Sequence, residues 1–132
     1  MSVLLDASAV IRLFELARPD VIAAVTAHDG EFALSLMTVG ELHRGVARAQ
    51  TPQVAALRSD TISMVLRRAQ VLLPNEETAA IWGKLAAKTP RKVRANDLWI
   101  AATALEHNLT LVSSDSELLS VLDGRSTLRI EP

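Results

Sequence analysis

Cysteine and tyrosine are both absent from this sequence, and aromatic residues make up only 3% of it. The lack of cysteine excludes disulfides, thiolate metal sites and a cysteine nucleophile, although it leaves the redox compartment undetermined. Because aromatic residues are so few, the core must be aliphatic. No apolar run approaches the roughly 20 residues that a membrane-spanning helix needs. The composition therefore predicts a soluble globular protein with an aliphatic core and no membrane partner.

A strong charge of one sign is also lacking, since the formal net charge is −1. No overall field draws such a chain toward nucleic acid, so any contact must come from local clusters such as Arg67-Arg68 or Arg91-Lys92-Arg94. The stretch MSVLLDASAV has no basic segment and carries Asp6 within its apolar run, which argues against a secretory signal. We expect a cytoplasmic protein with a single domain over residues 1–132, because this length buries one core without disulfides or metals.

Short apolar runs alternate with segments of helical periodicity along the whole chain. Strands are predicted at 3–5, 32–36, 71–73, 110–112 and 128–130. Helices are predicted at 9–16, 20–27, 41–49, 52–69, 76–87, 97–106 and shortly after 115. Turns are expected at His28-Asp29-Gly30 and Asp123-Gly124. This alternation predicts the α/β class.

The stretch 96–115, NDLWIAATALEHNLTLVSSD, places one acid before a helix and another after a strand. In an alternating α/β layout the helix runs antiparallel to the strands, so its first turn lies at the carboxyl edge of the sheet. Asp97 at the start of the helix and Asp115 just beyond the strand are therefore expected at the same edge. Open α/β sheets bind their ligands at that edge.

Two more acids are expected at this edge, because Asp6 follows the first strand and Glu41 begins the helix after the second. Four carboxylates close together repel one another and retain protons unless a cation neutralises them. Mg²⁺, or Mn²⁺ in its place, prefers such oxygen ligands. The three histidines are scattered and form no metal-binding pattern. The sequence thus predicts a magnesium site suited to phosphoryl transfer, in which a metal-activated water attacks phosphorus.

We assign the principal metal to Asp6 and Asp97, with Asp115 as a further ligand. Glu41 and Asp115 are assigned to the nucleophilic water and to any second ion, since a carboxylate outside the metal shell can accept the proton of the water. Ser113 is a supporting residue, which either hydrogen-bonds a ligand carboxylate or satisfies the backbone at the end of the strand.

Three of these acids also have a purely structural explanation. Thr38-x-x-Glu41 and Ser114-x-x-Glu117 match capping boxes, and Asp115 would then lie in a first helical turn. Asp97 could be a surface residue at the N-cap or first position of its helix. Taken singly, capping is the more common role for an acid at a helix start.

Asp6 differs from the other acids, because a carboxylate at the end of an apolar strand has no equally good structural explanation. The expected N-cap of the first helix is Ser8, with orientation of Asp6 as its second possible role. Asp6 is therefore the strongest functional candidate.

Four motifs together resemble the PIN domain: Asp6-Ala7-Ser8, Val39-Gly40-Glu41-Leu42 with Gly45, Asp97 to Ala104, and Leu111 to Asp115. Their order and spacing carry the resemblance, which covers essentially the whole chain. The chain length and the segment DLWIAATALEHNLTLVS are similar to VapC, the ribonuclease toxin of bacterial and archaeal VapBC toxin-antitoxin modules.

The resemblance implies a five-stranded parallel sheet between helices and Mg²⁺- or Mn²⁺-dependent endonucleolytic cleavage of RNA by the toxin of a type II system. It also implies a homodimer and a hetero-oligomer with a cognate VapB-type antitoxin. Asp6, Glu41, Asp97 and Asp115 match the four acids of the family. Ser113 stands where many members have threonine, so the hydroxyl is kept.

Two alternatives belong to other functional classes. One is a receiver-like module that binds a divalent metal and accepts a phosphoryl group on one aspartate. The other is a catalytically silent interaction module whose acids only cap helices. A divalent-ion thermal shift separates the silent module from a metal-dependent enzyme, because bound ligand stabilises the folded state.

Overall fold

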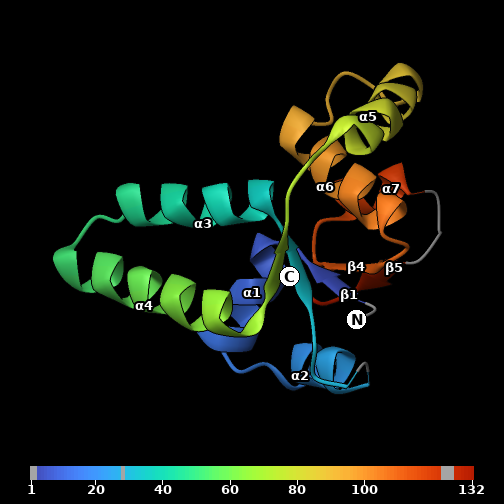
Figure 1. Cartoon of the computed structure of the whole chain (residues 1–132). Helices are drawn as coiled ribbons and strands as arrows, with labels where there is room; N and C mark the ends of the chain where they lie inside the picture. The colour runs from blue at the N-terminus through green and yellow to red at the C-terminus, as the bar shows by residue number, and fades with distance from the viewer. Residues whose placement is uncertain (1–2, 28, 123–126) are drawn as a thin grey trace.

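The computed structural model describes residues 3–27, 29–122 and 127–132, so the turns expected at His28 and at Asp123-Gly124 lie outside the described residues. The strands are β1 (Val3–Leu5), β2 (Ala33–Ser35), β3 (Gln70–Leu72), β4 (Thr110–Ser113) and β5 (Thr127–Arg129). The helices are α1 (Ala7–Phe14), α2 (Pro19–Thr26), α3 (Leu36–Ala47), α4 (Pro52–Arg68), α5 (Glu76–Lys88), α6 (Ala95–Glu106) and α7 (Ser116–Val121). The predicted α/β class is confirmed (Figure 1).

The five strands form one sheet in the order β3-β2-β1-β4-β5, and every neighbouring pair is parallel. This confirms the five-stranded parallel sheet implied by the family resemblance. β1 lies in the middle and is buried along its whole length, as expected for a strand covered on both faces. All five carboxyl ends meet at one edge, because the strands run in the same direction.

Successive residues of β1 contribute to two separate cores, since side chains alternate between the faces of a strand. Val3 and Leu5 pack with apolar residues of α1, α2, α3 and α4. Leu4 packs on the opposite face with residues of α6 and α7. α5 packs against α6 on the outer side of that layer (Figure 1). The sheet is therefore covered by helices on both faces.

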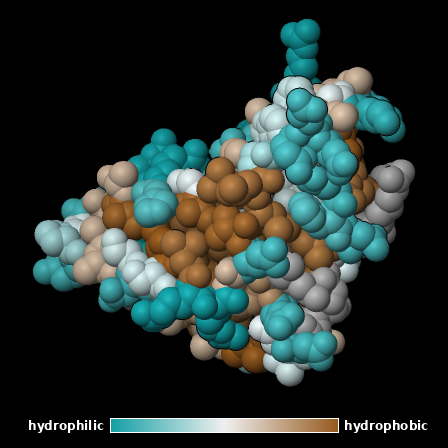
Figure 2. Space-filling view, in the orientation of Figure 1, coloured by the Kyte–Doolittle hydropathy of each residue, from teal (hydrophilic) through white to brown (hydrophobic). Residues whose placement is uncertain are grey.

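The hairpin of α3 and α4 extends away from the sheet (Figure 1). Apolar surface gathers between these helices and toward the middle of the molecule (Figure 2). On α4 alone, Leu57 is 55% exposed, and Met64 and Leu66 are also exposed. Among the helices within the described ranges, none combines the length and apolar character needed to cross a membrane.

Candidate active site at the carboxyl edge of the sheet

Asp6 is the most firmly held of the predicted site acids. Its Oδ1 accepts hydrogen bonds from the Ala9 backbone N–H (2.9 Å) and from the Ser8 hydroxyl (2.6 Å). Its Oδ2 accepts a hydrogen bond from the Ser113 hydroxyl. The residue is only 6% exposed. Three donors therefore fix this carboxylate where β1 ends, and the first of the two roles considered for Ser113, a hydrogen bond to a site carboxylate, is observed.

The prediction that Ser8 caps the first helix is wrong, because Asp6 is the N-cap residue. Strand β1 ends at Leu5 and α1 begins at Ala7, so only one residue lies between them. Asp6 keeps an extended backbone, and its carboxylate accepts a hydrogen bond from the Ala9 N–H in the first turn of the helix. Ser8 instead donates to Asp6 and accepts from the Ser114 backbone N–H at 3.1 Å. Asp6 thus has a structural role that the sequence did not reveal.

Asp115 is the N-cap of α7, so the predicted Ser114-Glu117 capping box is wrong. Its Oδ1 accepts from the backbone N–H groups of Glu117 (2.9 Å) and Leu118 (3.3 Å). Its own N–H donates to the Ser113 hydroxyl at 2.9 Å. Ser113 therefore links Asp115 to Asp6, because its hydroxyl accepts from one and donates to the other.

Asp97 is the third residue of α6, so the structural alternative of a surface residue at the N-cap or first position is wrong. Arg94 is the N-cap residue and makes no side-chain capping bond. Asp97 is only 5% exposed. Arg94 Nε lies 3.5 Å from Asp97 Oδ2, while the arginine side chain itself is 62% exposed. A solvent-exposed cation therefore faces this buried carboxylate.

Glu41 lies in the second turn of α3, because this helix begins at Leu36, five residues earlier than predicted. The Thr38-Glu41 capping box is therefore also wrong, and Ser35 caps the helix instead. The apolar run continues without a break from β2 into α3, so periodicity could not separate strand from helix. The Glu41 carboxylate faces Arg44, with Arg44 Nη2 3.7 Å from Glu41 Oε2.

The four acids influence one another electrostatically. Burial is the main cause that raises the pKa of Asp6, Glu41 and Asp97. Neighbouring acids raise these pKa values further: Asp115 acts on Asp6 and Asp97, while Asp6 acts on Glu41 and Asp97. Asp97 also raises the pKa of Glu41. The structure therefore brings the four predicted residues together at the carboxyl edge, as the sequence led us to expect.

Two arginines partly offset this repulsion. Arg94 lowers the pKa of both Asp97 and Glu41, and Arg44 lowers the pKa of Glu41. The sequence did not identify the pairing of Arg94 with Asp97. The available signal was the spacing of three residues within a helical segment, which brings side chains to the same face.

The donor set suits a hard divalent ion, because all four groups offer carboxylate oxygens. Within residues 3–27, 29–122 and 127–132, however, no three histidine, aspartate or glutamate side chains are arranged so that they could hold one metal ion. Asp97 and Glu41 face Arg94 and Arg44 instead. The structure therefore shows four interacting carboxylates, two of them paired with exposed cations.

A family model described as PIN domain matches residues 3–123. The chain is 34% identical to Ribonuclease VapC5 of Mycobacterium tuberculosis over 101 residues, covering 74% of this chain and 73% of the relative. It is 32% identical to Ribonuclease VapC1 of Haemophilus influenzae strain R2866 over 119 residues, covering 86% of each. The crystal structure of VapBC-5, from the VapBC family of toxin-antitoxin systems of Mycobacterium tuberculosis, superposes with a TM-score of 0.73 at 29% identity, covering 99% of this chain and 98% of that one. The chain therefore belongs to the PIN domain family and, within it, to the VapC group.

Proposed function

We propose that this protein is a Mg²⁺-dependent endoribonuclease, with Mn²⁺ as a possible substitute, that acts as the toxin of a type II VapBC module. The observation that carries the proposal is the group of four interacting carboxylates at the carboxyl edge of a PIN-domain sheet. Three of these carboxyl groups have a raised pKa, so the site favours a cation. Relatives that align over most of the chain are named ribonucleases.

Asp6 and Asp97 would hold the ion, with Asp115 as a further ligand. For this, Asp97 must turn from Arg94 toward Asp6, and the exposed arginine can move without disturbing the core. The bound ion supplies positive charge that stabilises the phosphoryl group and the leaving oxygen. Ser8 and Ser113 position Asp6, because their hydroxyls donate to its two oxygens.

The reaction is hydrolysis of a phosphodiester bond, in which the oxygen of a water bonds to phosphorus, the bond from phosphorus to a ribose oxygen breaks, and the ribose oxygen takes up a proton from solvent water. Glu41 accepts the proton of that water, because its raised pKa makes it a better base than an ordinary carboxylate. Arg44 and Arg94 are exposed at the same edge and can bind non-bridging phosphate oxygens once released from the acids.

We further propose a VapB-type antitoxin as partner, together with a homodimer and a toxin-antitoxin hetero-oligomer in the cytoplasm. The structures that superpose on this chain include VapBC-5 of Mycobacterium tuberculosis and VapBC-1 of nontypeable Haemophilus influenzae. The exposed apolar residues of α4 support an interface, because large apolar patches mark interaction surfaces.

The proposal is tested by incubating the purified protein with a pool of single-stranded and hairpin RNAs. We expect discrete cuts with Mg²⁺ that disappear with EDTA and in the Asp6→Asn and Asp97→Asn variants. Mg²⁺ at 100 times its Kd should also raise the free energy of unfolding by about 2.7 kcal/mol.

A catalytically silent interaction module remains a second candidate, because both Asp6 and Asp115 cap helices. Under that alternative, Mg²⁺ neither stabilises the protein nor produces cuts. Absence of both effects in antitoxin-free protein would refute the proposed nuclease.

A further inference from the structure

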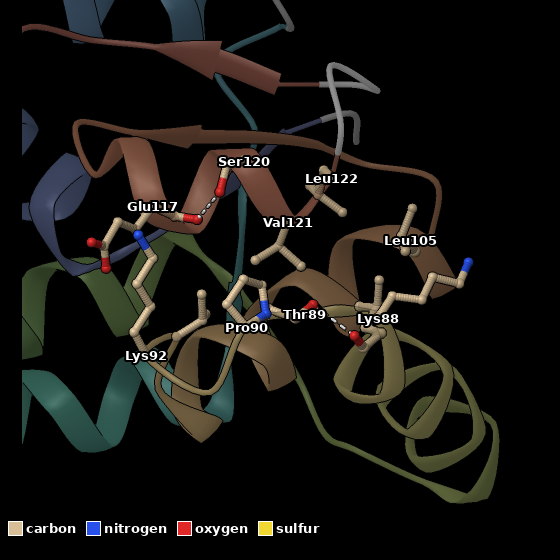
Figure 3. Close-up of a pocket in the computed structure, with 11 residues that line it drawn as sticks. Lys88, Thr89, Pro90, Lys92, Leu105, Glu117, Ser120, Val121 and Leu122 are labelled. Carbon is tan, nitrogen blue, oxygen red and sulfur yellow. Dashed lines mark hydrogen bonds between the residues drawn. The ribbon is translucent and has the colours of Figure 1, made fainter.

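A hollow of about 330 Å³ lies outside the four-acid site, between the end of α5, the loop that follows it, and α7 (Figure 3). Its walls come from some of the side chains within residues 85–93 and 117–122, together with Leu105 of α6. This volume is at the lower end of the range for small-ligand pockets, about 300 to 1,000 Å³. The hollow is therefore large enough for one small planar group.

The hollow adjoins the candidate active site on two sides. Val93 lines it and directly precedes Arg94, which faces Asp97. On the other side, Glu117 lines it and donates its backbone N–H to Asp115. The hollow and the candidate active site therefore share the segment before α6 and the first turn of α7.

The inside of the hollow is apolar. Leu85, Val93 and Val121 contribute to its walls. The hydroxyls of Thr89 and Ser120 donate to carbonyls of their own helices at 2.6 Å (Figure 3). Because both hydroxyls already donate hydrogen bonds within the protein, the walls suit the flat face of an apolar or aromatic group.

The rim of the hollow carries charge. Lys88 and Lys92 stand at its edge, and the Lys92 side chain points toward Glu117, the one acid among the lining residues (Figure 3). Residues 78–96 contain five lysines and arginines and no acid, although the whole chain has a net charge of −1. Positive charge is therefore concentrated on one side of the hollow.

An apolar interior with a cationic rim matches the chemistry of a nucleotide. In RNA recognition, lysine and arginine bind phosphates, while unstacked bases of single strands insert between side chains. We propose that the hollow is a base-binding subsite for a nucleotide that flanks the cleaved phosphate, and that Lys88 and Lys92 bind the adjoining backbone phosphates. This inference rests on the proposed function, and it makes the hollow a determinant of cleavage-site preference.

The first test measures RNA binding without cleavage. A fluorescein-labelled single-stranded 12-nucleotide RNA of mixed sequence is titrated with protein in EDTA, and anisotropy gives Kd at several salt concentrations. We expect the Lys88→Ala/Lys92→Ala variant to bind at least about tenfold more weakly at low salt. The slope of log affinity against log salt concentration should decrease in magnitude by about 1.4, since each phosphate contact on a single strand contributes about 0.7 to that slope.

The charge-matched control is Arg48→Ala/Lys84→Ala. Both residues are exposed, and neither lines the hollow. We expect this variant to keep the wild-type Kd within about twofold and the wild-type salt slope. An equal loss of RNA affinity in both double variants would mean that RNA binding depends only on the overall charge of the protein. That result would refute the subsite.

The second test fills the hollow without changing any charge. Ser120 is exposed and lines the hollow, so Ser120→Trp places a ring inside it. Ala80→Trp adds the same ring on an exposed part of α5 outside the hollow. We expect about tenfold weaker RNA binding and altered cleavage sites for Ser120→Trp alone, with both melting temperatures close to that of the wild type.

The outcomes separate this inference from the proposed function. If the wild type cleaves RNA and the hollow variants bind and cut like it, the subsite is refuted and the nuclease stands. If the wild type neither binds nor cleaves RNA, both fail. If the hollow variants weaken binding of the antitoxin while RNA binding is unchanged, the hollow is a protein-docking site and the subsite is refuted.

Discussion

The two halves of the acid cluster are held in different ways. Asp6 and Asp115 lie directly beyond the central strands, and donors from the chain itself bind their carboxylates. Asp97 and Glu41 lie on helices, and the exposed side chains of Arg94 and Arg44 face them. One half is therefore fixed by backbone N–H groups and by serine hydroxyls, whereas the charge of the other half is partly neutralised by arginine side chains at the surface.

The difference indicates which half can change when a ligand binds. In each pair the arginine is solvent-exposed and the carboxylate is largely buried, so a metal ion that takes the place of the arginine displaces only a surface side chain. Hydrogen bonds to a buried carboxylate are costly to break, because an unpaired buried polar group costs about 1 to 3 kcal/mol. We expect the Asp6 half to stay in place and the Asp97 half to rearrange.

The largest effect is expected from Asp97→Asn, which keeps the shape of the side chain and removes its charge. Cleavage should fall at least about 100-fold, as for the loss of one preorganised electrostatic group. The melting temperature in EDTA should not fall, because burial and two neighbouring acids oppose the ionised form of Asp97. RNA cleavage and thermal unfolding check both expectations. Cleavage within threefold of the wild type would remove Asp97 from the catalytic set.

The next effect is expected from Ser113→Ala, which leaves Asp6 Oδ2 and the Asp115 N–H without their partner. Urea unfolding should show a loss of about 1 to 3 kcal/mol. Mg²⁺ affinity should fall by about 10- to 100-fold, as for other residues that orient metal ligands. Ser120→Ala, at an exposed position of α7, is the control and should change stability by less than about 0.5 kcal/mol. Equal effects of both variants would contradict the positioning role.

The third prediction concerns pH, which should change cleavage activity and stability in opposite directions. Asp6, Glu41 and Asp97 have pKa values raised above the ordinary 3.8 for aspartate and 4.5 for glutamate, mainly by burial. The folded state thus binds protons more readily than the unfolded state, so their contribution to stability is lost as pH rises through the raised values. Cleavage needs the ionised forms and should fall by about tenfold for each pH unit below the pKa of an essential group.

Cleavage rates and urea unfolding in EDTA, measured across the acid range, check these opposite trends. The Asp97→Asn variant should lose part of the pH dependence of stability. An unchanged stability profile in that variant would show that Asp97 does not titrate in this range.

The smallest effect is expected from Arg44→Ala. Arg44 is about half exposed and its ion pair with Glu41 is long, so stability should change by less than about 1 kcal/mol. Its removal should raise the pKa of Glu41 further, because Arg44 lowers it in the wild type. The low-pH limb of the cleavage profile should then move to higher pH. A large loss of stability would show that the arginine pairs hold Glu41 and Asp97 as firmly as the hydrogen bonds hold Asp6.

Sequence reasoning succeeded for the strands, for the starts of α4 and α5 and for the convergence of the acids, and it failed at the starts of α1 and α3. β1 was predicted with its observed bounds, because a short buried run ends abruptly at an acid. α3 was predicted five residues too late, because apolar residues continue from β2 into the helix. The roles of Ser8 and Asp6 at the first N-cap were exchanged, since either side chain can cap a helix and only the backbone path decides between them.

The sequence by itself determined the order of strands and helices and the position of each acid near a strand end or helix start. These features follow from local periodicity and from the shared direction of the strands. Tertiary structure alone decided which groups surround each acid. Ser113 reaches Asp6 across 107 positions of the chain because β1 and β4 pair in parallel with Leu5 opposite Val112. That register depends on packing of both faces of the sheet, which no local pattern records.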